Sequence, residues 1–168
     1  MAIRHALEAD VAALPALEVA AGELFRVLGM DAVADDDPLA STVFADARRR
    51  KRLLVAAADG GVVVGFVLLR DLDGAMHIEQ LAVAPEWGRQ GIGRGLMSAA
   101  ADLARDSGAA TMTLTTFRDV PFNGPFYAAL GWRVIPEHAL SPGLARVRDD
   151  ERAVGLDRWP RQAMWSNT

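Results

Sequence analysis

Hydrophobic and polar residues along this chain follow two periods, which predict strands and helices in turn. Short apolar runs, and segments in which apolar and polar residues alternate, predict about six to seven strands. These runs lie at 2–6, 53–58, 62–69, 76–83, 111–116, 132–135 and 161–165. Apolar residues spaced three and four positions apart predict helices. The helical patterns begin at 8–10, continue in a second piece at 18–28, and recur at 42–52, 91–104 and 126–130, whereas the acidic segment 31–38 predicts a polar loop.

The turns between these elements predict how the strands pair. Asp59-Gly60-Gly61 and Asp73-Gly74 each join two strand patterns, as in antiparallel hairpins. A helix joins the strands at 76–83 and 111–116, and a helical crossover of this kind makes a strand pair parallel. The chain therefore predicts an α/β (α+β) fold with a mixed, mostly antiparallel central sheet of six to seven strands flanked by helices.

Composition narrows the class of protein. The chain has 168 residues and no repeat or linker, so we expect one domain over 1–168 with its own hydrophobic core. The net charge of −4 argues against a nucleic-acid partner, and the absence of cysteine excludes disulfides and thiol catalysis. There is no apolar run of membrane-spanning length and no signal-peptide pattern, so we expect a cytoplasmic protein without a membrane partner.

A glycine-rich turn separates the strand at 76–83 from the helix that follows it. The turn contains Gly88, Gly91, Gly93 and Gly95. Glycine lets a ligand approach the backbone closely, and the free N–H groups at a helix start favour a phosphate, although an ordinary structural turn has the same composition. A nucleotide P-loop is excluded because Arg94 and Gly95 stand where it needs Lys-Ser/Thr, and a dinucleotide fingerprint fits poorly because Leu96 replaces its third glycine. We therefore expect a phosphorylated cofactor of another kind.

The turn resembles a known family motif. Residues 89–96, RQGIGRGL, are similar to the acetyl-CoA pyrophosphate loop of the GNAT family of N-acetyltransferases, whose pattern is Gln/Arg-x-x-Gly-x-Gly/Ala. In one register the motif glycines are Gly91 and Gly93, and Gly88 occupies the opening position. In the other register Gln90 opens the motif, and the glycines are two residues further along. We prefer the first register, because the surrounding residues then fall where the family usually places them.

A second segment strengthens the resemblance. NGPFYAALGWR at 123–133 is similar to the family's Asn…Tyr-x-x-Leu-Gly-Phe motif, with Trp132 in place of Phe. The order of predicted elements is also similar to the family over nearly the whole chain. The resemblance implies a GNAT-like acyl-CoA acyltransferase fold, with acetyl-CoA as cofactor and no metal.

The resemblance also implies a set of cofactor-binding residues. The pyrophosphate would bind the backbone of the loop, with two arginine side chains adding positive charge. The pantetheine arm would pair with the exposed backbone of the strand, as an added strand does. The loop residues are Arg89, Gln90, Gly91, Ile92, Gly93 and Arg94, the strand residues are Leu81, Ala82 and Val83, and the second motif adds Asn123 and Phe126.

Two residues are candidates for proton transfer. Glu79 lies in an otherwise apolar strand and matches a carboxylate that serves as general base in many members; its alternative role is that of a strand-edge residue facing solvent. Tyr127, the only tyrosine, matches the family residue that protonates the departing thiolate; its alternative role is that of a core aromatic residue. His77 shares a face with Glu79 in a regular strand, so it is either a second base or part of the acceptor pocket.

The acceptor is the least defined part of this interpretation. The acidic residues between 18 and 37 suit a cationic amine but also a solvated loop; they are Glu18, Glu23, Asp31, Asp35, Asp36 and Asp37. Trp159 and Trp165 in the tail fit the sheet, the acceptor pocket or a dimer contact equally well. The resemblance implies transfer of an acetyl group from acetyl-CoA to a primary amine, on a small molecule or a peptide, by direct attack in a ternary complex. A homodimer is a family-level expectation, and the alternative function is a non-catalytic acyl-CoA-binding sensor or interaction module.

Overall fold

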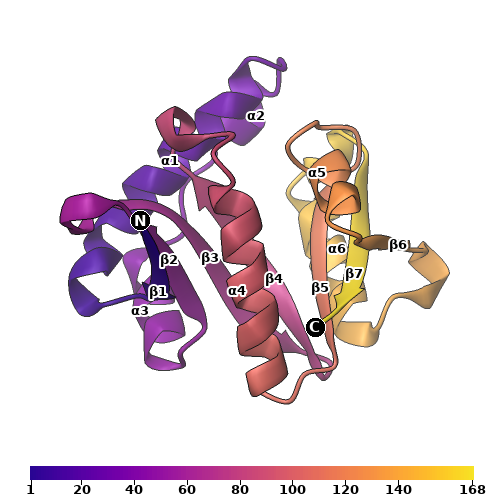
Figure 1. The fold of residues 1–168 in the computed structure, drawn as a ribbon. Helices are drawn as coiled ribbons and strands as arrows, with labels where there is room; N and C mark the ends of the chain where they lie inside the picture. The colour runs from indigo at the N-terminus through magenta and orange to yellow at the C-terminus, as the bar shows by residue number, and fades with distance from the viewer. The chain divides into compact units, whose positions relative to one another are not determined.

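The computed structural model describes all residues from 1 to 168, in seven strands, six α-helices and short 3-10 helices (Figure 1). The strands are β1 (Ala2–His5), β2 (Leu53–Ala57), β3 (Val63–Leu72), β4 (Ala75–Val83), β5 (Thr111–Phe117), β6 (Arg133–Ile135) and β7 (Arg161–Asn167). The helices are α1 (Leu14–Arg26), α2 (Asp31–Ala34), α3 (Ser41–Arg49), α4 (Ile92–Asp106), α5 (Gly124–Ala129) and α6 (Pro142–Ala153). Every predicted strand is present, with its ends shifted by a few positions.

The strands form one sheet in the order β1-β2-β3-β4-β5-β7-β6. The pairs β1–β2, β2–β3, β5–β7 and β6–β7 are antiparallel. The pair β4–β5 is parallel, as the helical crossover between them requires. The predicted fold class is therefore confirmed: a mixed, mostly antiparallel sheet with flanking helices.

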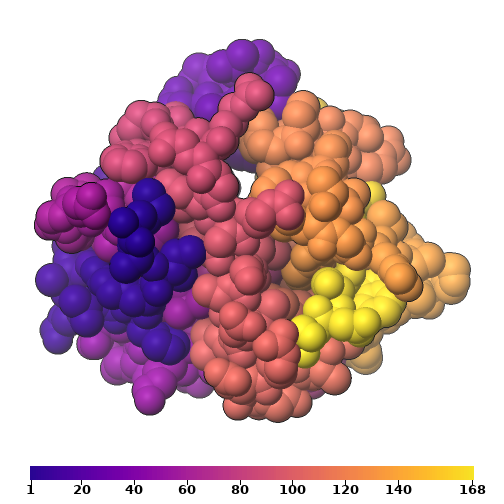
Figure 2. Space-filling view, viewed as in Figure 1, coloured from indigo at the N-terminus to yellow at the C-terminus, as the bar shows by residue number.

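Contacts within the chain divide it into two compact units, which we describe one at a time. The first comprises Met1–Arg70 and Glu79–Ala100, and the second comprises Asp71–Ile78 and Ala101–Thr168. Strands β3 and β4 and helix α4 contribute residues to both. Figure 2 shows the N-terminal residues of the first unit, in indigo, at the surface. The single domain expected from the sequence stays a prediction.

The first unit has a core of aromatic and aliphatic side chains. Phe44 of α3 and Phe66 of β3 are fully buried and meet edge to face, with ring centroids 5.2 Å apart. Leu14 and Leu17 of α1 join the same cluster. All five residues of β2 are buried, so this strand is a continuous apolar run rather than an alternating one. The two helical pieces predicted from 8–10 onward and at 18–28 correspond to a 3-10 helix at Glu8–Ala13 and to α1. Pro15 lies in the first turn of α1, where its missing N–H costs no hydrogen bond.

The second unit is built on β5 and β7, which pair over seven residues from Thr111↔Asn167 to Phe117↔Arg161. Its helix α6 was not predicted. The sequence of α6 is mostly polar, and among its few buried residues is the charged Arg148. An inward-facing arginine breaks the apolar period by which a helix is recognised. Another difference lies in the first unit, where the short helix α2 occupies part of the loop predicted at 31–38, so that part of the loop prediction is wrong.

Candidate active site

The glycine-rich turn leads from β4 into α4 through a short 3-10 helix, Pro85–Trp87. Gly88 donates its N–H to the Pro85 carbonyl (3.0 Å) and closes this 3-10 turn. The first backbone bond of α4 runs from the N–H of Gly95 to the carbonyl of Gly91 (2.9 Å). Between these two bonds, the six amides of residues 89–94 donate to no other backbone group. A consecutive series of unpaired N–H groups at the start of a fifteen-residue helix is an anion-binding arrangement.

The backbone of this loop twice adopts a left-handed conformation. Arg89 has φ 61° and Gly91 has φ 81°. Left-handed residues between right-handed ones turn successive N–H groups toward a common point, which makes a concave anion site. Arg89 carries a side chain in a conformation that normally favours glycine, and such strain is typical of functional loops.

The glycines of the turn have different roles. Gly91 needs its freedom of φ, as described above. At Gly95, by contrast, an added Cβ would lie 2.8 Å from the terminal methyl of the Ile3 side chain, so this glycine packs closely against β1. The register of the motif stays a prediction.

The strand before the turn supplies the other predicted cofactor contacts in the first unit. Ala82 is 3% exposed, whereas Leu81 and Val83 are half-buried. The Ala84 N–H donates to the Val64 carbonyl (2.9 Å), which holds the end of β4 on β3. At the other end of β4, the parallel ladder with β5 comprises three pairs and ends at Ile78↔Leu114.

Glu79 forms an ion pair that sequence reasoning missed. The Nε of Arg70, in β3, lies 2.5 Å from its Oε2. The side chains are 44% exposed for Arg70 and 34% exposed for Glu79, so neither charge is sealed from solvent. An arginine nine residues before its partner in a hairpin belongs to no periodic pattern or motif, so the pair could not be predicted from the sequence.

His77 lies in the second unit and is only 2% exposed. Its Nδ1 lies 2.9 Å from the hydroxyl oxygen of Thr113, the residue directly across the ladder in β5. This hydrogen bond fixes the imidazole within the sheet. The sequence left two roles open for His77, a second base or a part of the acceptor pocket. Neither role is needed to explain why His77 is buried and hydrogen-bonded here.

Tyr127 lies in helix α5 of the second unit, within an aromatic cluster. Its ring centroid is 5.1 Å from that of Phe126 and 6.0 Å from that of Trp132. The residue is 9% exposed, and burial raises the pKa of the Tyr127 phenol well above its ordinary value. The phenol is protonated at neutral pH, as an unperturbed tyrosine also is, and this is the form that a proton donor needs.

Asn123 precedes α5, at a position from which its side chain could cap the helix. The side chain makes no capping hydrogen bond to the helix, however. Its Oδ1 instead accepts a hydrogen bond from the hydroxyl of Thr116 (3.0 Å), on the buried end of β5. The side chain of Asn123 therefore binds the strand rather than the helix end.

Gly124, the first residue of α5, is a further position that the sequence did not single out. A Cβ on this residue would lie 2.3 Å from the carbonyl oxygen of Arg118. The helix that carries Tyr127 can therefore approach the end of β5 only because residue 124 has no side chain.

The acidic segment of the first unit is largely neutralised by one arginine. The Arg26 guanidinium pairs with Glu23 (2.9 Å), Asp35 (2.6 Å) and Asp31 (3.7 Å). The half-buried Glu18 accepts the N–H of Leu39 (3.0 Å), and burial raises the pKa of this carboxyl. These contacts favour an ordinary structural role over an open acidic rim.

A pocket of about 230 Å³ opens in the second unit, among β4, β5, β6, β7 and α6. Trp165, Thr113 and Leu144 contribute to its walls. None of the predicted catalytic or cofactor-binding residues lines it. Of the two tail tryptophans, Trp165 thus packs on the sheet with Arg133 over its ring (5.9 Å), and Trp159 meets Phe117 edge to face (6.3 Å).

The predicted site residues are divided between the two units. The first contains Glu79, Leu81–Val83 and the loop 89–94, and the second contains His77, Asn123, Phe126 and Tyr127. None of the helices combines the length and apolar character that a membrane crossing requires.

Comparisons with known proteins give a family and a fold. The sequence model of the acetyltransferase (GNAT) family matches residues 15–132. N-acetylglutamate synthase from Neisseria gonorrhoeae, solved with coenzyme A and N-acetyl-glutamate, has a TM-score of 0.72 at 19% identity; the match covers 99% of this chain and only 34% of that chain. The ribosomal-protein-S18-alanine N-acetyltransferase from Escherichia coli has a TM-score of 0.67 at 17% identity, with 99% and 92% covered. The PaiA N-acetyltransferase from Thermoplasma acidophilum, solved with coenzyme A, has a TM-score of 0.69 at 15% identity, with 99% and 98% covered.

Proposed function

The chain belongs to the acetyltransferase (GNAT) family, and from that premise we propose that it transfers an acetyl group from acetyl-CoA to a primary amine by direct attack in a ternary complex. The family resemblance drawn from the glycine turn and the tyrosine motif is confirmed. The class of enzyme, an acetyl-CoA-dependent acetyltransferase, follows from the family. The acceptor, the mechanism and the role of each residue are the content of the proposal.

One observation carries the proposal for this chain: the unpaired amides of residues 89–94. A diphosphate has several oxygens that accept hydrogen bonds, and this loop offers donors without first having to break backbone bonds. Arg89 and Arg94 are exposed beside these amides and add positive charge. The half-buried backbone of Leu81 and Val83 would extend the same binding surface along the pantetheine arm.

The chemistry requires protons to be taken from the nitrogen and one proton to be given to the sulfur. An alkylammonium has a pKa of about 10, so its first proton must be removed before the nitrogen attacks. Glu79 would take this proton, directly or through water. The nitrogen forms a bond to the acetyl carbon and loses its second proton to solvent, and the carbon–sulfur bond breaks. Tyr127 would give its phenolic proton to the thiolate and recover a proton from solvent.

The similar proteins suggest acceptors of two sizes. One was solved with N-acetyl-glutamate bound, and another is a ribosomal-protein-S18-alanine N-acetyltransferase. A small-molecule amine and a peptide amine are both consistent with the proposed chemistry.

Calorimetric titration with acetyl-CoA tests the proposal first, with ATP and NAD as controls. We expect saturable binding of acetyl-CoA alone, followed by amine-dependent release of free thiol. Tyr127→Phe should keep cofactor affinity while lowering kcat by about 100-fold or more, as the loss of a general acid does. Failure to bind acetyl-CoA would contradict the proposal. Binding without thiol release for any amine would favour the non-catalytic acyl-CoA-binding module.

A further inference from the structure

The carboxylate that we propose as general base is paired with a permanent cation. Arg70 places its Nε 2.5 Å from the Oε2 of Glu79. A guanidinium cannot lose its proton in a protein, so this charge persists at every working pH. Both side chains are partly exposed, so a ligand that reaches Glu79 also meets Arg70.

An amine without other charges is poorly suited to such a pair. Such an amine is a cation at neutral pH, and the positive charge of Arg70 repels it from the Glu79 carboxylate that would otherwise attract it. A ligand that carries a carboxylate beside its amine has the opposite effect. The fork of the guanidinium binds a carboxylate with two parallel hydrogen bonds, and Glu79 is then left to receive the ammonium group.

From this pair we infer that the acceptor is a free amino acid, with its carboxylate on Arg70 and its ammonium on Glu79. The two protein charges are in contact, so the two ligand charges must also lie close together, as they do across one carbon in an α-amino acid. The amino terminus of a peptide lacks that neighbouring carboxylate. The inference rests on the proposed function and narrows its acceptor from amines in general to small zwitterions.

The test compares matched acceptors. Each free L-α-amino acid is assayed against its α-carboxamide and its decarboxylated amine, by thiol release from acetyl-CoA. We expect kcat/KM for the preferred free acid to exceed that of both analogues at least tenfold. Arg70→Gln should reduce this preference at least tenfold, mainly by raising KM, and Arg70→Lys should restore part of it, because lysine keeps the charge but not the fork.

Two measurements keep the result interpretable. Calorimetry with acetyl-CoA shows that each Arg70 variant is folded and binds its cosubstrate like the parent. Arg105→Gln is the matched control, because Arg105 forms an exposed ion pair with Asp102 (2.8 Å) on α4 and has no part in the proposed site. This control should leave the preference for free acids unchanged.

The outcomes separate the inference from the proposed function. If carboxamides or decarboxylated amines are acetylated as well as the free acids, or if Arg70→Gln leaves the preference unchanged, the inference is overturned and acetyl transfer stands. If acetyl-CoA binds but none of these acceptors is acetylated, the inference is overturned, and the proposed function is overturned as well when peptide amines also fail to react.

Discussion

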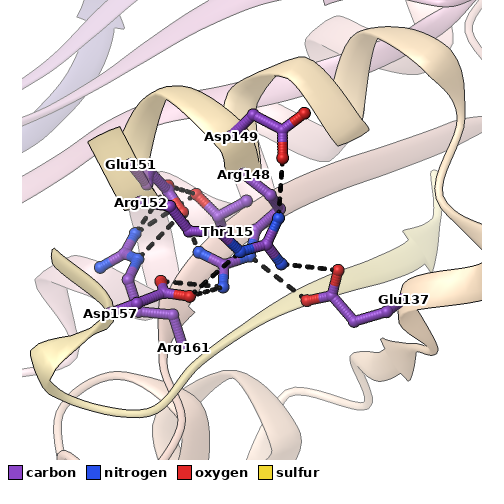
Figure 3. Close-up of polar contacts among 8 residues, drawn as sticks. All are labelled: Thr115, Glu137, Arg148, Asp149, Glu151, Arg152, Asp157 and Arg161. Atoms are coloured by element: carbon purple, nitrogen blue, oxygen red, sulfur yellow. Dashed lines mark hydrogen bonds and ion pairs between the residues drawn. The ribbon is translucent and has the colours of Figure 1, made fainter. Parts of the chain in front are cut away.

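Replacing Glu151 with glutamine should destabilise the protein strongly, because this carboxylate is the centre of a buried network of charges (Figure 3). Glu151 lies on α6 and is 12% exposed. It accepts hydrogen bonds from the guanidinium groups of Arg148 and Arg161 and from the Thr115 hydroxyl. The two arginine side chains are only 2% and 9% exposed.

The expected magnitude follows from what the substitution leaves behind. Glutamine has nearly the same shape and can keep one neutral hydrogen bond, but it removes the only negative charge between two buried cations. Asp157 still pairs with Arg148 (3.0 Å), whereas Arg161 keeps a hydrogen bond to the Thr115 hydroxyl (3.3 Å) and its position over the Phe117 ring (4.3 Å) but no carboxylate partner. Removing one partner of a buried ion pair lowers the free energy of unfolding by about 3–5 kcal/mol. Because the contacts that remain compensate in part, we expect Glu151→Gln to lie at the lower end of that range.

Urea unfolding at pH 7 measures this loss, and thermal unfolding checks it. For a chain of this size a loss of about 3 kcal/mol lowers Tm by roughly 6–12 °C. The matched control is Asp102→Asn, which breaks an exposed pair whose side chains are 56% and 65% exposed. Such pairs contribute about 0–1 kcal/mol, so the control should lie close to the parent.

The pH dependence gives a second, independent check. Burial raises the pKa of Glu151, but the hydrogen bonds and charges of Arg161, with Thr115 and Arg148, outweigh burial and hold this pKa below its ordinary value. A carboxyl with a lowered folded-state pKa stabilises the fold above its unfolded pKa of about 4.3 and loses that contribution as the pH falls through the folded value. The stability difference between the parent and the Glu151→Gln variant should therefore shrink steadily as the pH falls below about 4.3 toward the lowered folded-state pKa. A loss below about 1 kcal/mol at pH 7, which is the value for a surface pair, would refute the reasoning, as would a difference that does not shrink with falling pH.

Three further substitutions test the local structure. Gly124→Ala puts a Cβ against the Arg118 carbonyl (2.3 Å), so α5 must move; we expect a loss of about 1–3 kcal/mol in urea unfolding, and parental stability would contradict the contact. Arg89→Gly relieves a positive φ; we expect a gain of about 0.5 kcal/mol in stability with weaker acetyl-CoA binding by calorimetry, and a loss of stability would show that the loop is unstrained. Burial raises the pKa of Glu18 although the Leu39 N–H opposes this shift, and Glu18→Gln mimics the protonated carboxyl that burial favours. The stability of this variant relative to the parent should therefore be highest at pH 7 and should shrink toward pH 4. A difference that does not depend on pH would argue against the raised pKa.

The strands and the phosphate loop could be predicted because their signals are local. A run such as Leu53–Ala57 between turn residues identifies a strand wherever it lies, and a series of glycines before a helix identifies an anion site without any knowledge of its neighbours. Helix α6 carries no such signal. Its inward residue Arg148 is buried only because Glu151 and Asp157 neutralise it, and a sequence pattern does not reveal that neutralisation.

The site residues divide in the same way. Tyr127 was predictable from a motif of neighbouring residues, whereas the need for glycine at 124 depends on a carbonyl six residues earlier that folds back against it. Arg70 was missed because its importance lies entirely in the charge of Glu79 across a hairpin. Residues whose role depends on a distant partner are visible only once the backbone has placed that partner.

The two arginine–glutamate pairs of this chain show how exposure decides what the same chemistry does. Glu151 and Arg161 are about nine-tenths buried, and separating them leaves charges that water cannot reach, so their pairing is fixed and serves the fold. Glu79 and Arg70 are more than a third and about two-fifths exposed, where an ion pair contributes only about 0–1 kcal/mol and water replaces either partner at little cost. Under our proposal, a zwitterionic ligand would substitute its own charges at Glu79 and Arg70 at little cost, whereas the same exchange at Glu151 would leave buried charges unpaired. The weakness of the exposed pair would then suit it to binding and releasing an acceptor in every catalytic cycle.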